Sequence, residues 1–175
     1  FYVLFHRQGL IDQWYQGPPR AAALLKQSTE RQREVGDELY DTYSRTRIDL
    51  IAELHHKRKH PLDEAVKMAQ RLFDRILFIA FCEDRRLLPE RIITEAYSVA
   101  GIHAVTNPRW QSFKNLFRSI DAGNETHGIP RYNGGLFEPH AVDDLELPDD
   151  PWTTFFRTIG NYDFADEVNL DVLGH

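Results

Sequence analysis

The chain has 175 residues, of which 42% are hydrophobic and 27% charged, and its formal net charge is −6. This composition is typical of a single globular domain and excludes an intrinsically disordered chain. Cys82 is the only cysteine, which excludes an intramolecular disulfide and a cysteine zinc cage and predicts a reducing, cytoplasmic environment. No apolar run has the length of a membrane span and no signal peptide is recognised, so we expect no membrane partner.

The charge is distributed unevenly along the chain. Residues 1–120 carry 19 Lys and Arg against 15 Asp and Glu, whereas residues 121–175 carry 2 against 12. Because an acidic surface repels the phosphate backbone, any face that contacts nucleic acid is expected within the first two-thirds.

Two long helices are predicted first. Between Asp37 and His60, apolar residues recur at spacings of three, four and seven, which is typical of an amphipathic helix. A second helix is expected to begin at Pro61, a residue suited to a first helical turn. Its last turns are apolar nearly all round, which predicts the central, most buried helix, with Phe73 and Ile76 facing inward.

Three shorter helices follow, each with a proline near its start and a glycine near its end. They are predicted over residues 89–101, 107–123 and 150–160, with Asn107 and Asp150 as N-caps. No alternating, strand-like pattern competes with them except near residue 133. The sequence therefore predicts a mainly α fold, an irregular helical bundle.

A long loop is predicted between Gly123 and Asp150, and loops of this length usually have a function. It contains GIPRYNGGLF, whose Asn-Gly step favours a tight turn and predicts a small hairpin at residues 130–137. Two interpretations are open for this segment. Its apolar side chains pin the loop onto the helices as a structural brace, or its paired glycines let a ligand or another backbone approach closely. We favour the brace, formed by Tyr132, Asn133, Gly134, Gly135, Leu136 and Phe137.

The run HHKRKH, residues 55–60, gathers three cations at the end of the first long helix. Lys57, Arg58 and Lys59 are candidate contacts to DNA phosphates. We favour the alternative, a solvated helix end whose cations complement the helix dipole. A metal site is not predicted, since the adjacent His55 and His56 point to different helix faces.

Two further motifs resemble catalytic ones. NPRW, residues 107–110, is one residue from the (N/D)PP(Y/F/W) motif of amino-methyltransferases, but Arg109 replaces the second proline and a capped helix start is the better interpretation. Glu83 and Asp84 resemble the carboxylate pair of a metal nuclease. Such nucleases take their acids from adjacent strands, so pairing with neighbouring arginines is expected instead. The sequence predicts no catalytic residue, cofactor-binding residue or metal ligand in this chain.

Several segments, in this order, resemble one family: ELYDTYSRTRIDLIAEL, AQRLFDRILFIAFCEDRRLLP, FKNLFRSIDAGN, IPRYNGGLF and YDFADEVNLDVLGH. They are similar to the region ahead of the methylase domain in fused, type IIG-like restriction–modification enzymes and related adenine-specific DNA methyltransferases of phage defence. The resemblance covers roughly residues 37–175. Residues 1–36 match less distinctly and are expected to be a connector or the tail of a nuclease domain.

The resemblance implies a helical spacer domain over residues 37–175 that leads into a methyltransferase domain beyond it. S-adenosylmethionine and magnesium are implied for the parent enzyme, which contacts double-stranded DNA, and no cofactor is implied for this chain. The chain begins at Phe1 without a methionine, and we expect it to be a piece of a longer polypeptide. Two alternatives stay open: a stand-alone helical protein-interaction module, and an independent hydrolase that uses Glu83, Asp84 and the histidines.

Overall fold

The structure, a computed structural model, describes residues 20–98, 106–132 and 134–162. Within these ranges the only β-type pairing is an isolated antiparallel bridge between Asn124 and Ile129, and no strand is formed. The predicted mainly α fold is confirmed. The elements are α3 (Arg20–Ala52), the π-helix η1 (Glu53–Lys57), α4 (Leu62–Asp84), α5 (Ile92–Tyr97), α6 (Pro108–Ala122), the 3₁₀ turns η2 (Glu125–His127) and η3 (Ala141–Asp144), and α7 (Trp152–Gly160).

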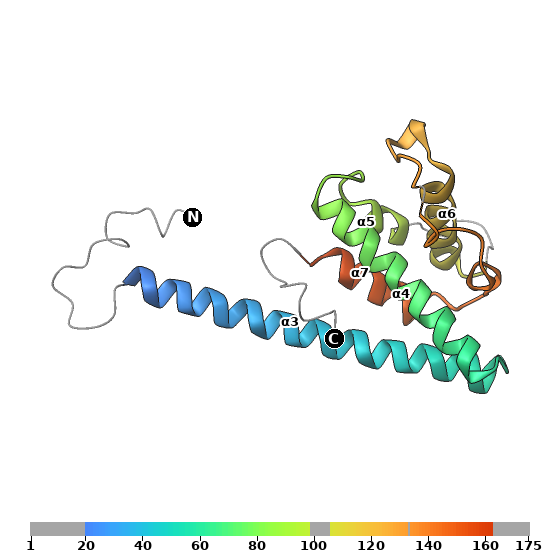
Figure 1. The fold of residues 1–175 in the computed structure, drawn as a ribbon, viewed down its shortest axis with the longest axis horizontal. Coiled ribbons are helices and arrows are strands. Elements are labelled where there is room, and N and C mark those ends of the chain that lie inside the picture. The colour runs from blue at the N-terminus through green and yellow to red at the C-terminus, as the bar shows by residue number, and fades with distance from the viewer. Residues whose placement is uncertain (1–19, 99–105, 133, 163–175) are drawn as a thin grey trace.

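Helix α3 is much longer than predicted. It has 33 residues and begins at Arg20 rather than at Asp37, which corresponds to a length of about 50 Å. Its C-terminal half packs against the other helices, whereas its N-terminal half extends beyond them (Figure 1). The predicted domain boundary between residues 36 and 37 thus falls inside one continuous helix.

The connection from α3 to α4 reverses the chain. The last turn of the first long helix widens into η1, where the Arg58 N–H donates to the Glu53 carbonyl. Lys59 then adopts a φ of 63°, in the left-handed region that disfavours helix continuation. The helix therefore ends at Lys57, not at His60 as predicted, and α4 returns along α3 (Figure 1).

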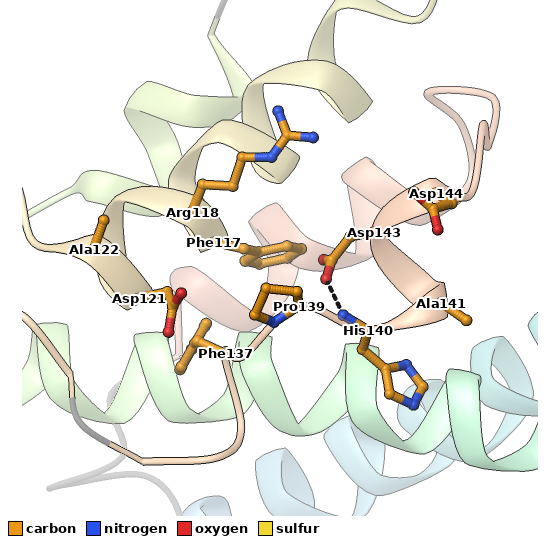
Figure 2. A pocket seen from close by; sticks show the side chains of 10 residues that line it. All are labelled: Phe117, Arg118, Asp121, Ala122, Phe137, Pro139, His140, Ala141, Asp143 and Asp144. Carbon is orange, nitrogen blue, oxygen red and sulfur yellow. Dashed lines mark hydrogen bonds between the residues drawn. The ribbon is translucent and has the colours of Figure 1, made fainter.

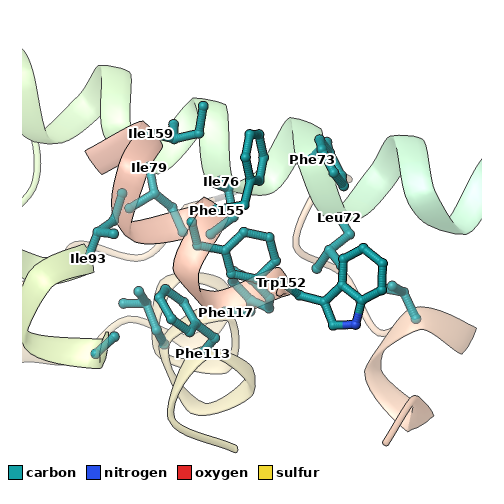
Figure 3. Close-up of a cluster of buried hydrophobic side chains, with 14 of the residues drawn as sticks. Leu72, Phe73, Ile76, Ile79, Ile93, Phe113, Phe117, Trp152, Phe155 and Ile159 are labelled. Atoms are coloured by element: carbon teal, nitrogen blue, oxygen red, sulfur yellow. The ribbon is translucent and has the colours of Figure 1, made fainter. Parts of the chain in front are cut away.

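Helix α4 is the centre of the bundle, as predicted. It contacts α3, α5, α7 and η3, and Figure 3 shows its apolar side chains meeting those of α5, α6 and α7. Phe73 is 1% exposed and Ile76 is fully buried, so both face inward as the sequence predicts. At about 1.5–3 kcal/mol for each fully buried large apolar side chain, this interface is the main source of stability.

The starts of α6 and α7 differ in their contacts from the sequence prediction. Asn107 occupies the N-cap position of α6, but its side chain makes no capping hydrogen bond. The Asp149 carboxylate accepts from the Trp110 N–H at 2.9 Å instead. Likewise Pro151, not Asp150, precedes α7, and the Asp150 carboxylate accepts from the Thr154 hydroxyl. Asn107 is thus the N-cap residue of α6 as predicted, although its side chain makes no capping contact, whereas the predicted cap Asp150 is wrong because Pro151 holds that position in α7.

The fold of the long loop also differs from the prediction. Residues 130–132 and 134–137 form no strand, so the hairpin predicted at residues 130–137 is wrong for the part that the structure describes. An isolated bridge lies earlier, between Asn124 and Ile129, and the Tyr132 N–H donates to the Ile120 carbonyl of α6 at 2.9 Å. The loop thus follows α6 before it turns towards α4.

Candidate functional site

The YNGGLF segment, residues 132–137, packs against α4. The Tyr132 ring lies 4.5 Å from the Phe78 ring, and the Phe137 ring lies 5.6 Å from it, measured between centroids. Tyr132 and Phe137 also contact each other edge to face at 5.5 Å. Aromatic pairs at these separations add to the stabilisation from apolar burial. Asn133, the remaining polar member of the motif, lies outside the described residues.

The two glycines of the segment have different surroundings. A Cβ added to Gly134 would lie 2.6 Å from the Tyr132 ring, whereas one added to Gly135 would meet only the Glu138 carboxylate at 3.8 Å. The close approach anticipated for these glycines is therefore made at Gly134 by the segment's own tyrosine ring.

Arg75 of α4 holds the segment in place. Its side chain is fully buried, and its guanidinium donates to the carbonyls of Leu136 at 2.8 Å and Glu138 at 3.0 Å and to the Asp143 carboxylate at 2.5 Å. Arg71, one turn earlier, donates to the Gly135 carbonyl at 3.0 Å. A planar guanidinium can satisfy several acceptors at once, so one buried cation organises the whole loop.

A cavity of about 580 Å³ opens beside this anchor, between α6 and η3 (Figure 2). Phe117 and Phe137 give it an apolar lining, and the Arg75 guanidinium lies 5.4 and 5.7 Å from the centres of these two rings. The Asp143 carboxylate accepts from the His140 N–H at 2.8 Å. Burial, together with the positive charges of Arg71 and Arg75, lowers the pKa of His140 below its ordinary value.

The three candidate phosphate contacts do not form one uniform patch. Lys57 is 76% exposed and pairs with Glu53 at 2.7 Å. Arg58 is only 29% exposed, lies 3.7 Å from the same carboxylate, and donates to the Glu146 carbonyl of the long loop. Lys59 is exposed. Two of the three cations are thus accessible to a ligand, while Arg58 ties the end of α3 to the loop.

Glu83, a residue of the acidic pair, has a structural role at the start of α5. Its carboxylate accepts from the backbone N–H groups of Arg91 at 2.5 Å and Ile93 at 3.4 Å. Burial raises the pKa of Glu83, and the two hydrogen bonds offset only part of that effect. Glu83 and Asp84 both line a cavity of about 300 Å³ that reaches Tyr162 at the end of α7.

This raised pKa predicts a pH-dependent stability. A carboxyl group whose pKa is higher in the folded state than in the unfolded state binds protons more tightly when folded. The contribution of Glu83 to the free energy of unfolding is most favourable below the ordinary pKa of 4.5 and is lost as the pH rises through the folded pKa.

We therefore expect Glu83→Gln to gain stability relative to the parent chain between pH 4 and pH 7, measured by urea unfolding. The exposed Glu90→Gln is the matched control, and parallel curves for the parent and Glu83→Gln would refute the prediction.

The NPRW motif is a helix start, as the sequence predicts. Trp110 is fully buried, and its indole N–H donates to the Leu145 carbonyl at 2.7 Å. The Arg109 guanidinium lies 4.3 Å from the centre of the Tyr97 ring. Neither aromatic ring is free to stack on a flipped base.

Arg75 and Asp149 are the important residues that sequence reasoning missed. Arg75 had a signal: it lies three residues after Leu72 and four before Ile79, within the apolar stripe of α4. A cation at such a position has to be paired inside the fold. No local signal in the sequence indicates the role of Asp149, because its partner, the Trp110 N–H, is 39 residues away.

Within the described residues, no group of three or more His, Cys, Asp or Glu side chains could hold a metal ion, and no helix could span a membrane. No protein-family model matches the chain, and neither a curated protein nor a solved structure matches it.

Proposed function

We propose that the chain is a non-catalytic helical spacer of a DNA restriction–modification enzyme, and that it positions nuclease and methylase domains on DNA. The family assignment rests on the ordered motifs of the sequence. The structural observation that supports the spacer role is the single 33-residue helix α3. It crosses from the segment attributed to the connector into the segment attributed to the spacer without a break.

A continuous helix suits this role because it transmits orientation as well as distance. A flexible linker of the same length would leave the attached domains free to rotate. The C-terminal half of α3 is fixed by Leu39 and Leu50, and η1, which continues it, by Leu54; all three are at most 1% exposed. The buried Arg75 in turn fixes the YNGGLF segment to α4. The body is thus suited to hold one rigid geometry between its neighbours.

In this proposal the chemistry belongs to the neighbouring domains. S-adenosylmethionine would bind the methylase domain and magnesium the nuclease domain, while this chain contacts double-stranded DNA only through exposed cations. The cellular location would be the cytoplasm.

The spacer role is tested by inserting four alanines after Gly36 in the full-length enzyme. An added Cβ at Gly36 meets no atom within 4 Å, so this part of α3 has room for change. Four helical residues add about 6 Å and about 40° of rotation. We expect methylation to persist while the position or efficiency of cleavage changes.

The same four residues inserted after Glu125, an exposed position in η2, serve as the control and should leave cleavage unchanged. Unaltered cleavage after the α3 insertion would reject the spacer role.

Contact with DNA phosphates predicts a specific salt dependence. Because Lys57 and Lys59 are exposed and Arg58 is engaged within the fold, the double variant Lys57→Gln, Lys59→Gln should weaken binding to all DNA sequences alike. The slope of log K against log salt should become shallower by about 0.9 per lost contact, or about 1.8 in total. Sequence preference should persist, since phosphate contacts position a protein without reading bases.

Arg86→Gln, at the far end of α4 and 84% exposed, is the control for a general change in charge. If the slope falls equally in this control and in the double variant, HHKRKH makes no specific phosphate contact and is a solvated helix end.

A second candidate function, a stand-alone helical interaction module, is favoured by one observation. An apolar groove with the 60%-exposed Leu87 lies at the C-terminal end of α4.

A further inference from the structure

The apolar groove at the end of α4 has a volume of about 350 Å³. Leu87 on its edge is 60% exposed, whereas most large apolar side chains of the described residues are buried. The surrounding walls come from α4, from the end of α6 and from the loop just before the YNGGLF segment. They are formed by Phe78, Phe81, Leu88, Ile120 and Pro130.

Two arginines lie at this groove. Arg131 belongs to its lining, and the exposed Arg85 has its guanidinium 5.4 Å from the centre of the Phe81 ring. No carboxylate is among the residues that line it. An apolar surface with cations beside it suits a segment that combines apolar side chains with carboxylates.

The sequence of residues 163–175 has this chemistry. It contains four acidic residues and no Lys or Arg, together with Phe164, Val168, Leu170, Val172 and Leu173. We propose that the groove at the end of α4 binds this acidic, apolar segment of the same chain. This proposal concerns the chain alone and does not depend on the spacer function.

The chain is long enough to reach. Tyr162, which directly precedes the segment, lines the neighbouring cavity with Ala80 and Glu83, at the same end of α4 as the groove. Extended chain spans up to about 3.3–3.6 Å per residue, so thirteen residues extend to about 40 Å. The width of the helix to be passed is only about 10–12 Å.

The test is limited proteolysis of the full chain with a protease that cuts after acidic residues, with cleavage at Asp166, Glu167 and Asp171 mapped by mass. Bound segment is protected, because a protease needs its substrate detached and extended. Replacing Leu87 with asparagine should raise the cleavage rate about tenfold, as expected for the loss of one large apolar contact. Neutralising Arg85 and Arg131 to glutamine should raise it as well, and added salt should act in the same direction.

Leu62→Asn is the matched control, since Leu62 is 55% exposed at the other end of α4. It should leave the cleavage rate unchanged. Equal rates for Leu87→Asn and Leu62→Asn would overturn the proposal, as would cleavage of the parent chain as fast as a free peptide of the same sequence. Protection that grows with protein concentration would also overturn it, because a second copy of the chain would then occupy the groove.

Discussion

Replacing Arg75 with alanine is expected to destabilise the fold by about 3–5 kcal/mol, the range for removing one partner of a buried ion pair. The variant leaves the Asp143 carboxylate and the carbonyls of Leu136 and Glu138 without their common donor. It also removes the cation packed against Phe117 and Phe137. Urea unfolding followed by circular dichroism measures the loss.

Arg71→Ala is the matched control for Arg75→Ala. Arg71 lies one turn earlier on α4 and donates a single, exposed hydrogen bond to the Gly135 carbonyl. Its loss should cost at most about 1 kcal/mol, typical of one hydrogen bond. Comparable losses for the two variants would show that the loop is not organised by the buried guanidinium.

A double-mutant cycle separates the ion pair from the rest of the anchor. Asp143 also accepts from the His140 N–H, so Asp143→Asn removes the charge while retaining an acceptor. If the pair is a main part of the anchor, Arg75→Ala should cost less in the Asp143→Asn background, because no partly buried carboxylate then loses its cation. Purely additive effects would assign the stability to the carbonyl contacts instead.

The helices were predictable because their signal is local. The apolar spacing of α4 and the proline and glycine positions that bound α6 and α7 are read within a few turns, and burial of Phe73 and Ile76 followed from the spacing. Capping was less predictable, since Asp149 and Glu83 serve helix starts that lie 39 and 8 residues away. The N-terminal half of α3 was missed because its sequence lacks the regular apolar spacing by which the first helix was recognised.

The YNGGLF segment illustrates where local reasoning fails. Its aromatic members pack on Phe78 of α4, and Phe137 is 3% exposed. The predicted hairpin needs the carbonyls of its strands for ladder hydrogen bonds, yet the carbonyls of Gly135 and Leu136 are bound by Arg71 and Arg75. Two side chains more than sixty residues away therefore decide the conformation, and the turn preference of the local sequence does not.

The basic run shows the same effect on a candidate site. Lys57, Arg58 and Lys59 are equivalent in sequence, but the reversal after η1 directs Arg58 towards the Glu146 carbonyl. Lys114 of α6 pairs with the Glu146 carboxylate at 2.7 Å. The middle cation of the run is thus part of a contact between the end of α3 and the loop, which only the folded chain reveals.

Phe73→Ala is expected to cost about 3–5 kcal/mol, the usual range for removing a large buried aromatic side chain. The Phe73 ring joins three helices, since it stands edge to face with Tyr43 of α3 at 5.2 Å and stacks on Phe155 of α7 at 4.9 Å. Its loss leaves a cavity where α3, α4 and α7 meet, so the unfolding midpoint should fall without a change in the denaturant slope.

Phe73→Leu, which refills much of the space, should recover more than half of the loss. A Phe73→Ala variant that unfolds within a few tenths of a kcal/mol of the parent chain would mean that α4 does not face the core as described.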